Sequence, residues 1–291
     1  MKLIRYFFEF ILVIIFFLIF KIIGLKLSSD LGEVIGKYFG PLFRKKTIAK
    51  KNILIAFPEL NEKSINKLID SMWKNIGRIF GEYIHINKFS IIDEKKNKIV
   101  FVNKNNIEIL KKNNRPIVFF SGHFANFELM AKCLQELGFN IGAIYRPLNN
   151  YFLNPIMEFI RKKYICPIQI EKGPAGTKKL IKHISTNNPL ALMIDQRLSS
   201  SIRVPFFNQP ATTTTTPAQL AIKYDALLVP VFLKRNEKTN FEFFIEEPLV
   251  INRTNDYDRN IYNITEIMNK KIEEFIKRDP AHWLWSHDRW K

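Results

Sequence analysis

The sequence predicts an α/β protein in which helices flank a mainly parallel sheet, with an apolar helix at the N-terminus. Two observations predict this. Short apolar runs alternate with segments of helical spacing from about residue 115 onward. Near the N-terminus, residues 6–25 form an apolar stretch of about the length that a bilayer-crossing helix needs.

The N-terminal apolar stretch is predicted to be an uncleaved membrane anchor, residues 1–27. Its core, Phe10 to Phe20, is unbroken, and the Lys-Ile-Ile-Gly-Leu-Lys that follows lacks the small-x-small pattern of a signal-peptide cleavage site. Glu9 and the short uninterrupted run leave open a helix that lies in the membrane surface. Residues 28–291 are then one attached domain, with a helical part over 28–95 and an α/β core over 96–291.

Basic residues follow the anchor with few acids to offset them, which by the positive-inside rule places the domain in the cytoplasm. They also suit contact with anionic inner-membrane lipids. These residues are Lys26, Lys37, Arg44, Lys45, Lys46, Lys50 and Lys51.

The α/β core is predicted element by element. Residues 30–90 are expected to be helical, with breaks at Pro41 and Pro58. Strands are expected at 115–121, 141–145, 168–171, 190–195, 227–235 and 240–246, and helices at 124–137, 154–164, 177–185, 217–224 and 257–278. A long loop is expected between the fourth strand and the fourth helix. Sites in such sheets lie beyond the carboxyl ends of strands, which directs attention to residues 122–123, 145–146 and 195–196.

The amino-acid composition of the chain narrows the range of binding partners and cofactors to expect. The chain carries a formal net charge of +18, which favours acidic partners. The sequence has no zinc-type spacing, RNP-type motif or Gly-rich clamp, so nucleic acid is not expected. The two cysteines, Cys133 and Cys166, form no CxxC pair and are expected as buried thiols. Neither a metal nor an organic cofactor is expected.

The strongest chemical feature is Ser-Gly-His-Phe-Ala-Asn-Phe-Glu over residues 121–128. If His123 lies in the turn after a strand and Glu128 in the first turns of the next helix, the two converge. A neutral imidazole then takes a proton from a hydroxyl as it attacks an acyl thioester, and the carboxylate orients the ring. A lone histidine is more often a buried structural residue, but this spacing favours catalysis.

The motif at residues 122–128 resembles the His-x4-Asp/Glu motif of glycerolipid-type acyltransferases, most of all the lauroyl and myristoyl transferases of lipid A biosynthesis. Other segments agree in order along nearly the whole chain, although Ala125, Phe127 and Asp288 depart from the expected pattern. The agreeing segments are residues 52–58, 144–147, 194–196, 204–207 with the threonine run at 212–216, and 283–287.

The resemblance implies a glycerolipid acyltransferase-like fold, acyl carrier protein as donor of a laurate-like chain, and a Kdo-bearing lipid A precursor as acceptor. It implies His123 and Glu128 as the catalytic pair. Arg146 and Arg161 are candidates for binding phosphate. Asp195 is a candidate for orienting Arg146 or its loop. Asn126, inside the motif, joins these as a candidate substrate-binding residue.

Three alternatives remain open at this level. The first is a related acyltransferase that acts on another phospho- or glycolipid. The second is a metal-dependent hydrolase, although no second histidine stands four residues from His123. The third is a membrane-attached binding protein, for which replacing His123 leaves function intact.

Overall fold

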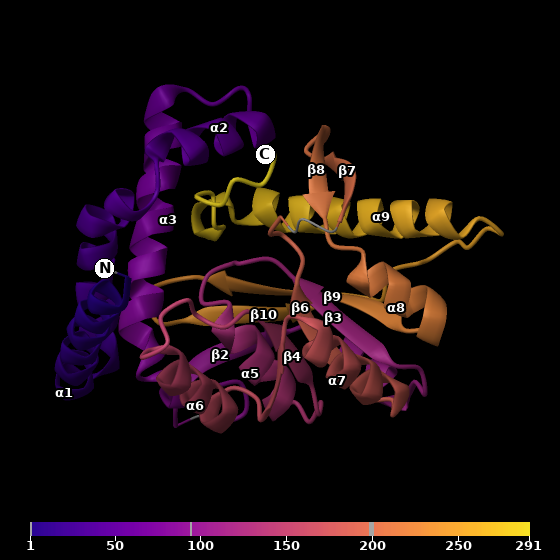
Figure 1. The fold of residues 1–291 in the computed structure, drawn as a ribbon, viewed down its shortest axis with the longest axis horizontal. Helices are drawn as coiled ribbons and strands as arrows, with labels where there is room; N and C mark the ends of the chain where they lie inside the picture. Colours follow the sequence, from indigo (N-terminus) through magenta and orange to yellow (C-terminus); the bar gives the residue numbers. More distant parts are fainter. Residues whose placement is uncertain (1, 94, 198–200) are drawn as a thin grey trace.

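A computed structural model describes residues 2–93, 95–197 and 201–291 (Figure 1). Its helices are α1 (Lys2–Phe43), α2 (Lys46–Ala56), α3 (Glu62–Tyr83), α4 (Asn105–Lys112), α5 (Glu128–Glu136), α6 (Asn154–Tyr164), α7 (Pro174–Ser185), α8 (Thr216–Tyr224) and α9 (Tyr257–Arg278), with 3-10 turns at Ile86–Lys88 and Pro280–His282. Its strands are β1 (Phe89–Ser90), β2 (Asn97–Val102), β3 (Ile117–Ser121), β4 (Gly142–Tyr145), β5 (Ile168–Glu171), β6 (Leu190–Met193), β7 (Ile202–Phe206), β8 (Gln209–Thr213), β9 (Leu227–Arg235) and β10 (Phe241–Ile245).

An eight-stranded sheet forms the centre, in the order β1-β2-β10-β9-β3-β6-β4-β5. Strand β3 pairs in parallel with both β9 and β6, and β4 pairs in parallel with both β6 and β5. The hairpin partner β10 is antiparallel to β9. The predicted fold class, a mainly parallel sheet flanked by helices, is therefore confirmed.

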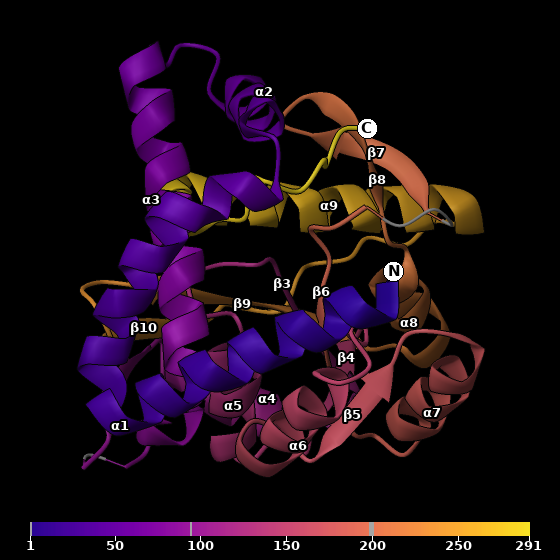
Figure 2. The same cartoon turned by 60° about the vertical axis from the view of Figure 1, so that its left-hand side comes forward.

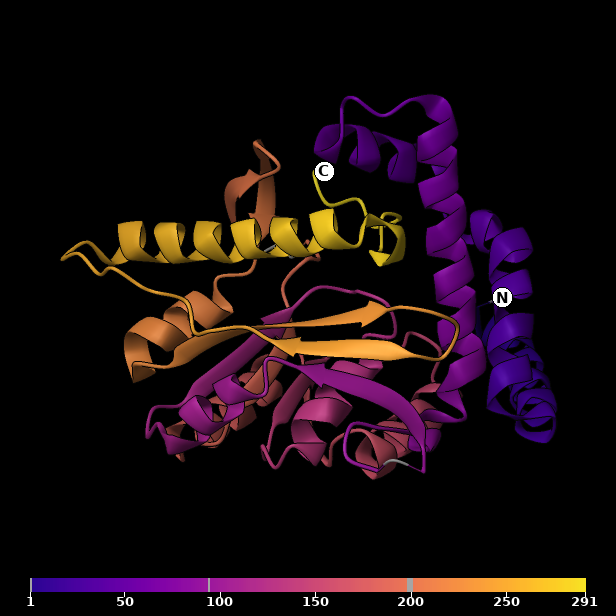
Figure 3. The same cartoon turned by 180° about the vertical axis from the view of Figure 1, so that it is seen from behind.

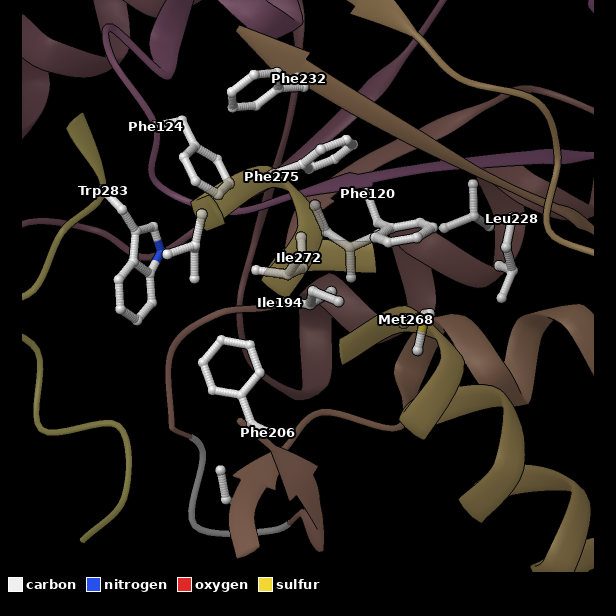
Figure 4. Close-up of a cluster of buried hydrophobic side chains, with 14 of the residues drawn as sticks. Phe120, Phe124, Ile194, Phe206, Leu228, Phe232, Met268, Ile272, Phe275 and Trp283 are labelled. Atoms are coloured by element: carbon white, nitrogen blue, oxygen red, sulfur yellow. The ribbon is translucent and has the colours of Figure 1, made fainter. Parts of the chain in front are cut away.

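Helices cover both faces of the sheet. On one face, α9 runs along the strands and packs an aromatic cluster against them (Figures 3 and 4). Phe232 of β9 stacks on Phe275 of α9 with ring centroids 4.7 Å apart, and Phe124 meets Phe232 edge-on at 5.0 Å. The other face belongs to a second core, to which α5 and α6 contribute. Successive residues of β3, Phe119 and Phe120, point into opposite cores, as the strand period requires.

Helix α1 has two halves separated at Gly24, whose φ of 79° is not helical. The second half lies along α3 (Figure 1). The two helices pack at very short range because glycines face each other across the contact. A Cβ placed on Gly77 would lie 2.0 Å from the carbonyl oxygen of Gly32, and one on Gly81 would lie 2.0 Å from that of Ser28. The small-residue spacing, four residues apart on each helix, is what lets the two backbones approach.

The structure differs from the sequence prediction at several boundaries. Pro41 lies inside α1 and does not end it, and α5 begins at Glu128, since residues 122–127 form an irregular turn. The elements β1, β2 and α4 were not predicted. The expected long loop contains the hairpin β7–β8, in which Pro205 faces Pro210. Two prolines and a threonine run interrupt the alternating apolar pattern of these strands, so the periodicity of the sequence does not predict them.

We predict that Gly77→Ala destabilises the protein by about 1–3 kcal/mol, although alanine favours helix over glycine by up to about 1 kcal/mol. The added methyl group forces α1 away from α3. Denaturant unfolding measures the effect, and Lys67→Ala, at an exposed position of α3, is the control, expected to change stability by less than about 0.5 kcal/mol. Unchanged or raised stability of the glycine variant would show that the close helix contact is wrong.

Candidate active site

His123 lies in the turn after β3, and Asp195 lies two residues beyond the end of the neighbouring strand β6. The Asp195 carboxylate holds this histidine at two points. Its Oδ2 accepts the backbone N–H of His123 at 2.7 Å, and its Oδ1 lies 2.7 Å from the ring Nδ1. The indole N–H of Trp283 donates to the same Oδ2 at 2.9 Å. The Trp283 indole is labelled in Figure 4, where it borders the aromatic core.

Asp195 is a buried anion, with 3% of its surface exposed. Burial opposes ionisation, but the facing charge of His123 and the donated hydrogen bonds outweigh it, and the pKa of Asp195 falls to about 2. An ionised carboxylate only accepts hydrogen bonds, so the His123 nitrogen that faces it, Nδ1, must carry a proton. The other ring nitrogen, Nε2, is then the basic one.

The Nε2 side of His123 faces the cavity. The side-chain amide nitrogen of Gln196 lies 3.3 Å from Nε2, which is the contact expected of a donor next to an unprotonated nitrogen. Phe127 packs edge-on against the ring, with centroids 4.7 Å apart. The imidazole is thus fixed in orientation and tautomer, with Nε2 toward the space that a substrate would enter.

Glu128 does not take the role that the sequence predicted for it. Its carboxylate pairs with Arg161, at 2.5 Å from Nη2 and 3.1 Å from Nε, and both side chains are mostly buried. This ion pair raises the pKa of Arg161 although burial opposes it. The carboxylate that orients the His123 ring is Asp195. Helical rotation explains this, because Glu128 begins α5 and points along its flank toward α6.

A cavity of about 930 Å³ brings together most of the candidate residues. His123, Glu128, Arg146 and Arg161 line it, and so does Lys172, whose backbone N–H donates to the carbonyl of Tyr145. That hydrogen bond keeps Lys172 and Arg146 adjacent, at the ends of the parallel strands β5 and β4. Burial and the charge of Arg146 lower the pKa of Lys172, although Asp195 opposes the change. The two cations give this rim an affinity for anions.

The cavity exists because the sheet opens. Strand β4 pairs with β6 at Gly142 and Ala143, whereas its pairing with β5 continues to Tyr145 and that of β3 with β6 continues to Met193. Beyond Ala143, the strands β4 and β6 separate. This is the place where the connections of the sheet change direction, which is where ligands bind in open α/β sheets.

Asn126 is not a cavity residue, which corrects the prediction that it binds substrate. It is 1% exposed, and its amide donates to Glu82 of α3 at 2.8 Å. Next to it, Ala125 has a φ of 45°, and its carbonyl accepts from Asn75 at 3.1 Å. These contacts hold the turn after β3 in a conformation that the residues alone would not favour. Asn126 therefore supports the position of His123 from behind.

Asp195 also differs from expectation, since its hydrogen bonds go to His123 and Trp283 and not to Arg146. Sequence reasoning gave no role to Gln196, Lys172 or Trp283. The strand-end rule had pointed to residues 195–196 without giving Gln196 a role. Lys172 directly follows the predicted strand at 168–171, so the same rule was a usable signal for it. Nothing in the sequence places Trp283, 88 residues beyond Asp195, against that carboxylate. Within the described residues, no group of three or more His, Cys, Asp or Glu side chains could hold a metal ion.

Comparison with known proteins decides the family. The sequence profile described as bacterial lipid A biosynthesis acyltransferase matches residues 1–291. The chain belongs to this family. A lipid A biosynthesis acyltransferase of Haemophilus influenzae is 21% identical over 278 residues, covering 94% of this chain and 84% of that protein. The lipid A biosynthesis palmitoleoyltransferase of Escherichia coli K12 is 25% identical over 278 residues, covering 90% and 84%.

Among solved structures, a 1-acyl-sn-glycerophosphate acyltransferase from Thermotoga maritima is similar, with a TM-score of 0.36, 11% identity, and coverage of 86% of this chain and 95% of that one. Membership of the lipid A acyltransferase family makes the chain an acyltransferase. Helix α1 is long and apolar enough to cross a membrane, and together with the family it suggests membrane association.

We predict that Asp195→Asn lowers stability at neutral pH by about 2 kcal/mol, and that this difference shrinks as the pH falls. The pKa of Asp195 is lowered from 3.8 to about 2, so its ionised form stabilises the fold fully above pH 3.8 and loses that effect as the pH falls through about 2. Unfolding by urea at several pH values measures it.

The control for this experiment is Asp258→Asn, at an exposed position in the first turn of α9. It should change stability little and with no comparable dependence on acid. A stability difference between wild type and Asp195→Asn that stays constant from pH 6 to pH 2 would contradict the buried, ionised carboxylate.

Proposed function

We propose that the chain transfers a laurate-like acyl group from acyl carrier protein to a hydroxyl of a Kdo-bearing lipid A precursor, with His123 as general base. The observation that carries the proposal is the fixed imidazole: Asp195 accepts from Nδ1–H, and Nε2 faces the cavity. We place the reaction at the cytoplasmic face of the inner membrane, where a basic domain attached by α1 meets both an acidic carrier protein and a phosphorylated lipid.

In this mechanism the acceptor hydroxyl oxygen attacks the thioester carbonyl carbon while Nε2 of His123 takes the hydroxyl proton. Asp195 stabilises the imidazolium that forms. When the tetrahedral intermediate collapses, the C–S bond breaks and the proton returns from Nε2 to the leaving thiolate. The products are an ester and the free thiol of the carrier. No serine or cysteine nucleophile is needed, because the acceptor supplies the attacking oxygen.

The ion pair between Glu128 and Arg161 contributes a positive charge to the site in this proposal. The pair sits in the cavity wall with side chains 10% and 14% exposed, and the carboxylate fixes the guanidinium in place. Arg161 is then a positioned positive group beside the reacting carbonyl, where negative charge develops. Arg146 and Lys172, at the rim, would hold a substrate phosphate. The same residues fit a different phospho- or glycolipid acceptor, which is the alternative.

In this proposal the acyl chain binds in the part of the cavity beside strand β6. Strand β6 lies inside the sheet, yet Ala191 and Met193, which face the α5–α6 core, are only partly buried, whereas Leu190 and Leu192 on the other face are buried. Ala131 of α5 and Ala143 of β4 line the same space. Three alanines in a core region leave room for a hydrocarbon chain.

We predict that purified wild type transfers acyl groups from acyl carrier protein to a Kdo-lipid A precursor, and that Asp195→Asn lowers kcat by roughly 100- to 10,000-fold with little change in KM. The carboxylate acts through His123 and does not touch substrate. Radiolabelled acyl transfer measures this, with His123→Ala as the fully impaired comparison and Asp258→Asn as the control.

Two results of that assay would contradict the proposal in different ways. Wild-type transfer rates in His123→Ala would exclude His123 as the general base and leave only the reaction class standing. Transfer to other phospho- or glycolipids in preference to the Kdo-bearing one, in an acceptor panel, would favour the alternative acceptor and leave the mechanism standing.

We also predict that Ala191→Leu shifts the preferred donor to chains shorter by about three carbons, because the added side chain fills the space at β6. Each methylene excluded from the cavity weakens binding about fourfold. A competition between donors of different length measures a ratio that does not depend on how much enzyme is folded. Ala175→Leu, on the exposed surface of α7, is the control. An unchanged ratio in Ala191→Leu would place the acyl chain elsewhere.

A further inference from the structure

The first half of α1, residues 2–23, does not stand away from the domain. At its beginning, the buried amide of Asn150, in the loop after β4, donates to the carbonyl oxygen of Tyr6 at 2.9 Å and to the carboxylate of Glu9 at 3.2 Å. The rings of the same loop pack on the helix. Tyr151 meets Tyr6 with centroids 5.4 Å apart, and Phe152 meets Phe7 and Phe10 at 5.8 Å each.

The other end of the same segment packs on α3. The Phe80 ring lies between three phenylalanines of α1, with centroids 5.8 Å from Phe16, 5.7 Å from Phe17 and 5.3 Å from Phe20. The segment thus contacts one folded domain near residues 6–10 and again near residues 16–20. Figure 2 shows it lying across the domain, with α6 below it in this view.

This double contact is incompatible with a helix that crosses the bilayer. A spanning helix of about 20 residues carries its far end about 30 Å from the domain, through lipid. Tyr6 would then be on the opposite side of the membrane from Tyr151. In the structure the two rings touch.

The outward face of the segment is nevertheless apolar. Its exposed side chains range from 39% exposed at Ile11 and Ile19 to 84% at Ile22. The further members of this face are Leu3, Ile4, Phe7, Phe8, Leu12, Ile15 and Leu18, and Tyr151 of the contacting loop continues it. Such a surface is far too apolar to stay in water. Lys2, Arg5 and Lys21 lie along the same helix and suit anionic lipid head groups.

We infer that the first half of α1 lies in the plane of the membrane surface, bound along the domain, with its outward face in the boundary between head groups and acyl chains of one leaflet. The contacts place it at the site edge, since the turn after β3 and the loop after β4 both touch the α1–α3 pair. This inference concerns attachment alone and does not require the proposed reaction.

The test is a disulfide between Tyr6→Cys and Tyr151→Cys, formed by oxidation in vesicles of zwitterionic and anionic phospholipid and read as a linked peptide by mass spectrometry. The two natural cysteines are buried, at 0% and 1% exposure. We expect a link within one chain. Phe20→Cys with Phe80→Cys is the control, because a spanning helix and an in-plane helix both allow it.

A second readout is the side of the vesicle from which Lys2→Cys reacts with an impermeant thiol reagent, compared with Lys291→Cys at the other end of the chain. We expect both to react from the same side. A missing Tyr6–Tyr151 link while the control pair links would overturn the inference, and so would labelling of the two ends from opposite sides.

The occupant of the outward face is tested with a fluorophore on Leu12→Cys, which is 55% exposed. Quenching by lipids that carry a spin label near the head group is expected. No quenching in vesicle-bound protein would show that this face does not lie in the lipid and would overturn the membrane assignment. A disulfide between the introduced cysteines of two different chains would show that the face contacts a second copy of the protein, which would also overturn it.

Discussion

The Asp195 carboxylate is the constraint on which the site depends. It accepts hydrogen bonds from the backbone and ring of His123 and from Trp283, and it therefore joins the end of β3, the end of β6 and the C-terminal segment at one buried charge. An unpaired buried charge is very costly, and these three donors offset that cost. The same requirement fixes which nitrogen of His123 is basic. The Asp195 carboxylate therefore affects both the stability of the fold and the chemistry proposed for His123.

A second buried charge holds the other side of the same turn. Glu82 of α3 is fully buried and accepts from Asn126 at 2.8 Å, from Ser29 of α1 at 2.8 Å, and from Arg235 at the end of β9 at 2.6 Å. The glycine contact between α1 and α3 brings these partners within reach. The α1–α3 helix pair is thus part of the scaffold behind His123, and the turn after β3 is held between α3 and the Asp195 cluster.

Much of the fold was predictable because most of its elements are regular. The strands of the parallel sheet are short apolar runs, and α9 was predicted at its observed bounds. The site was predictable as far as strand ends and a motif reveal it: His123, Arg146 and Asp195 follow apolar runs. The hydrogen-bond partner of the His123 ring was not predictable, because Glu128 is close to His123 in sequence whereas Asp195 is 72 residues away. Asn126 looked functional for the same reason, and only tertiary packing shows that it faces Glu82.

The most direct measurement is the protonation of the two His123 ring nitrogens, observed by nitrogen NMR on protein with labelled histidine at slightly alkaline pH. The account predicts a neutral ring with the proton on Nδ1 and a free Nε2. In Asp195→Asn it predicts that the preference for a proton on Nδ1 is lost, because the amide that replaces the carboxylate can donate as well as accept a hydrogen bond. The spectrum of His123→Ala assigns the signal. A proton on Nε2 in the wild type, or a tautomer unchanged by Asp195→Asn, would contradict the central role of the buried carboxylate.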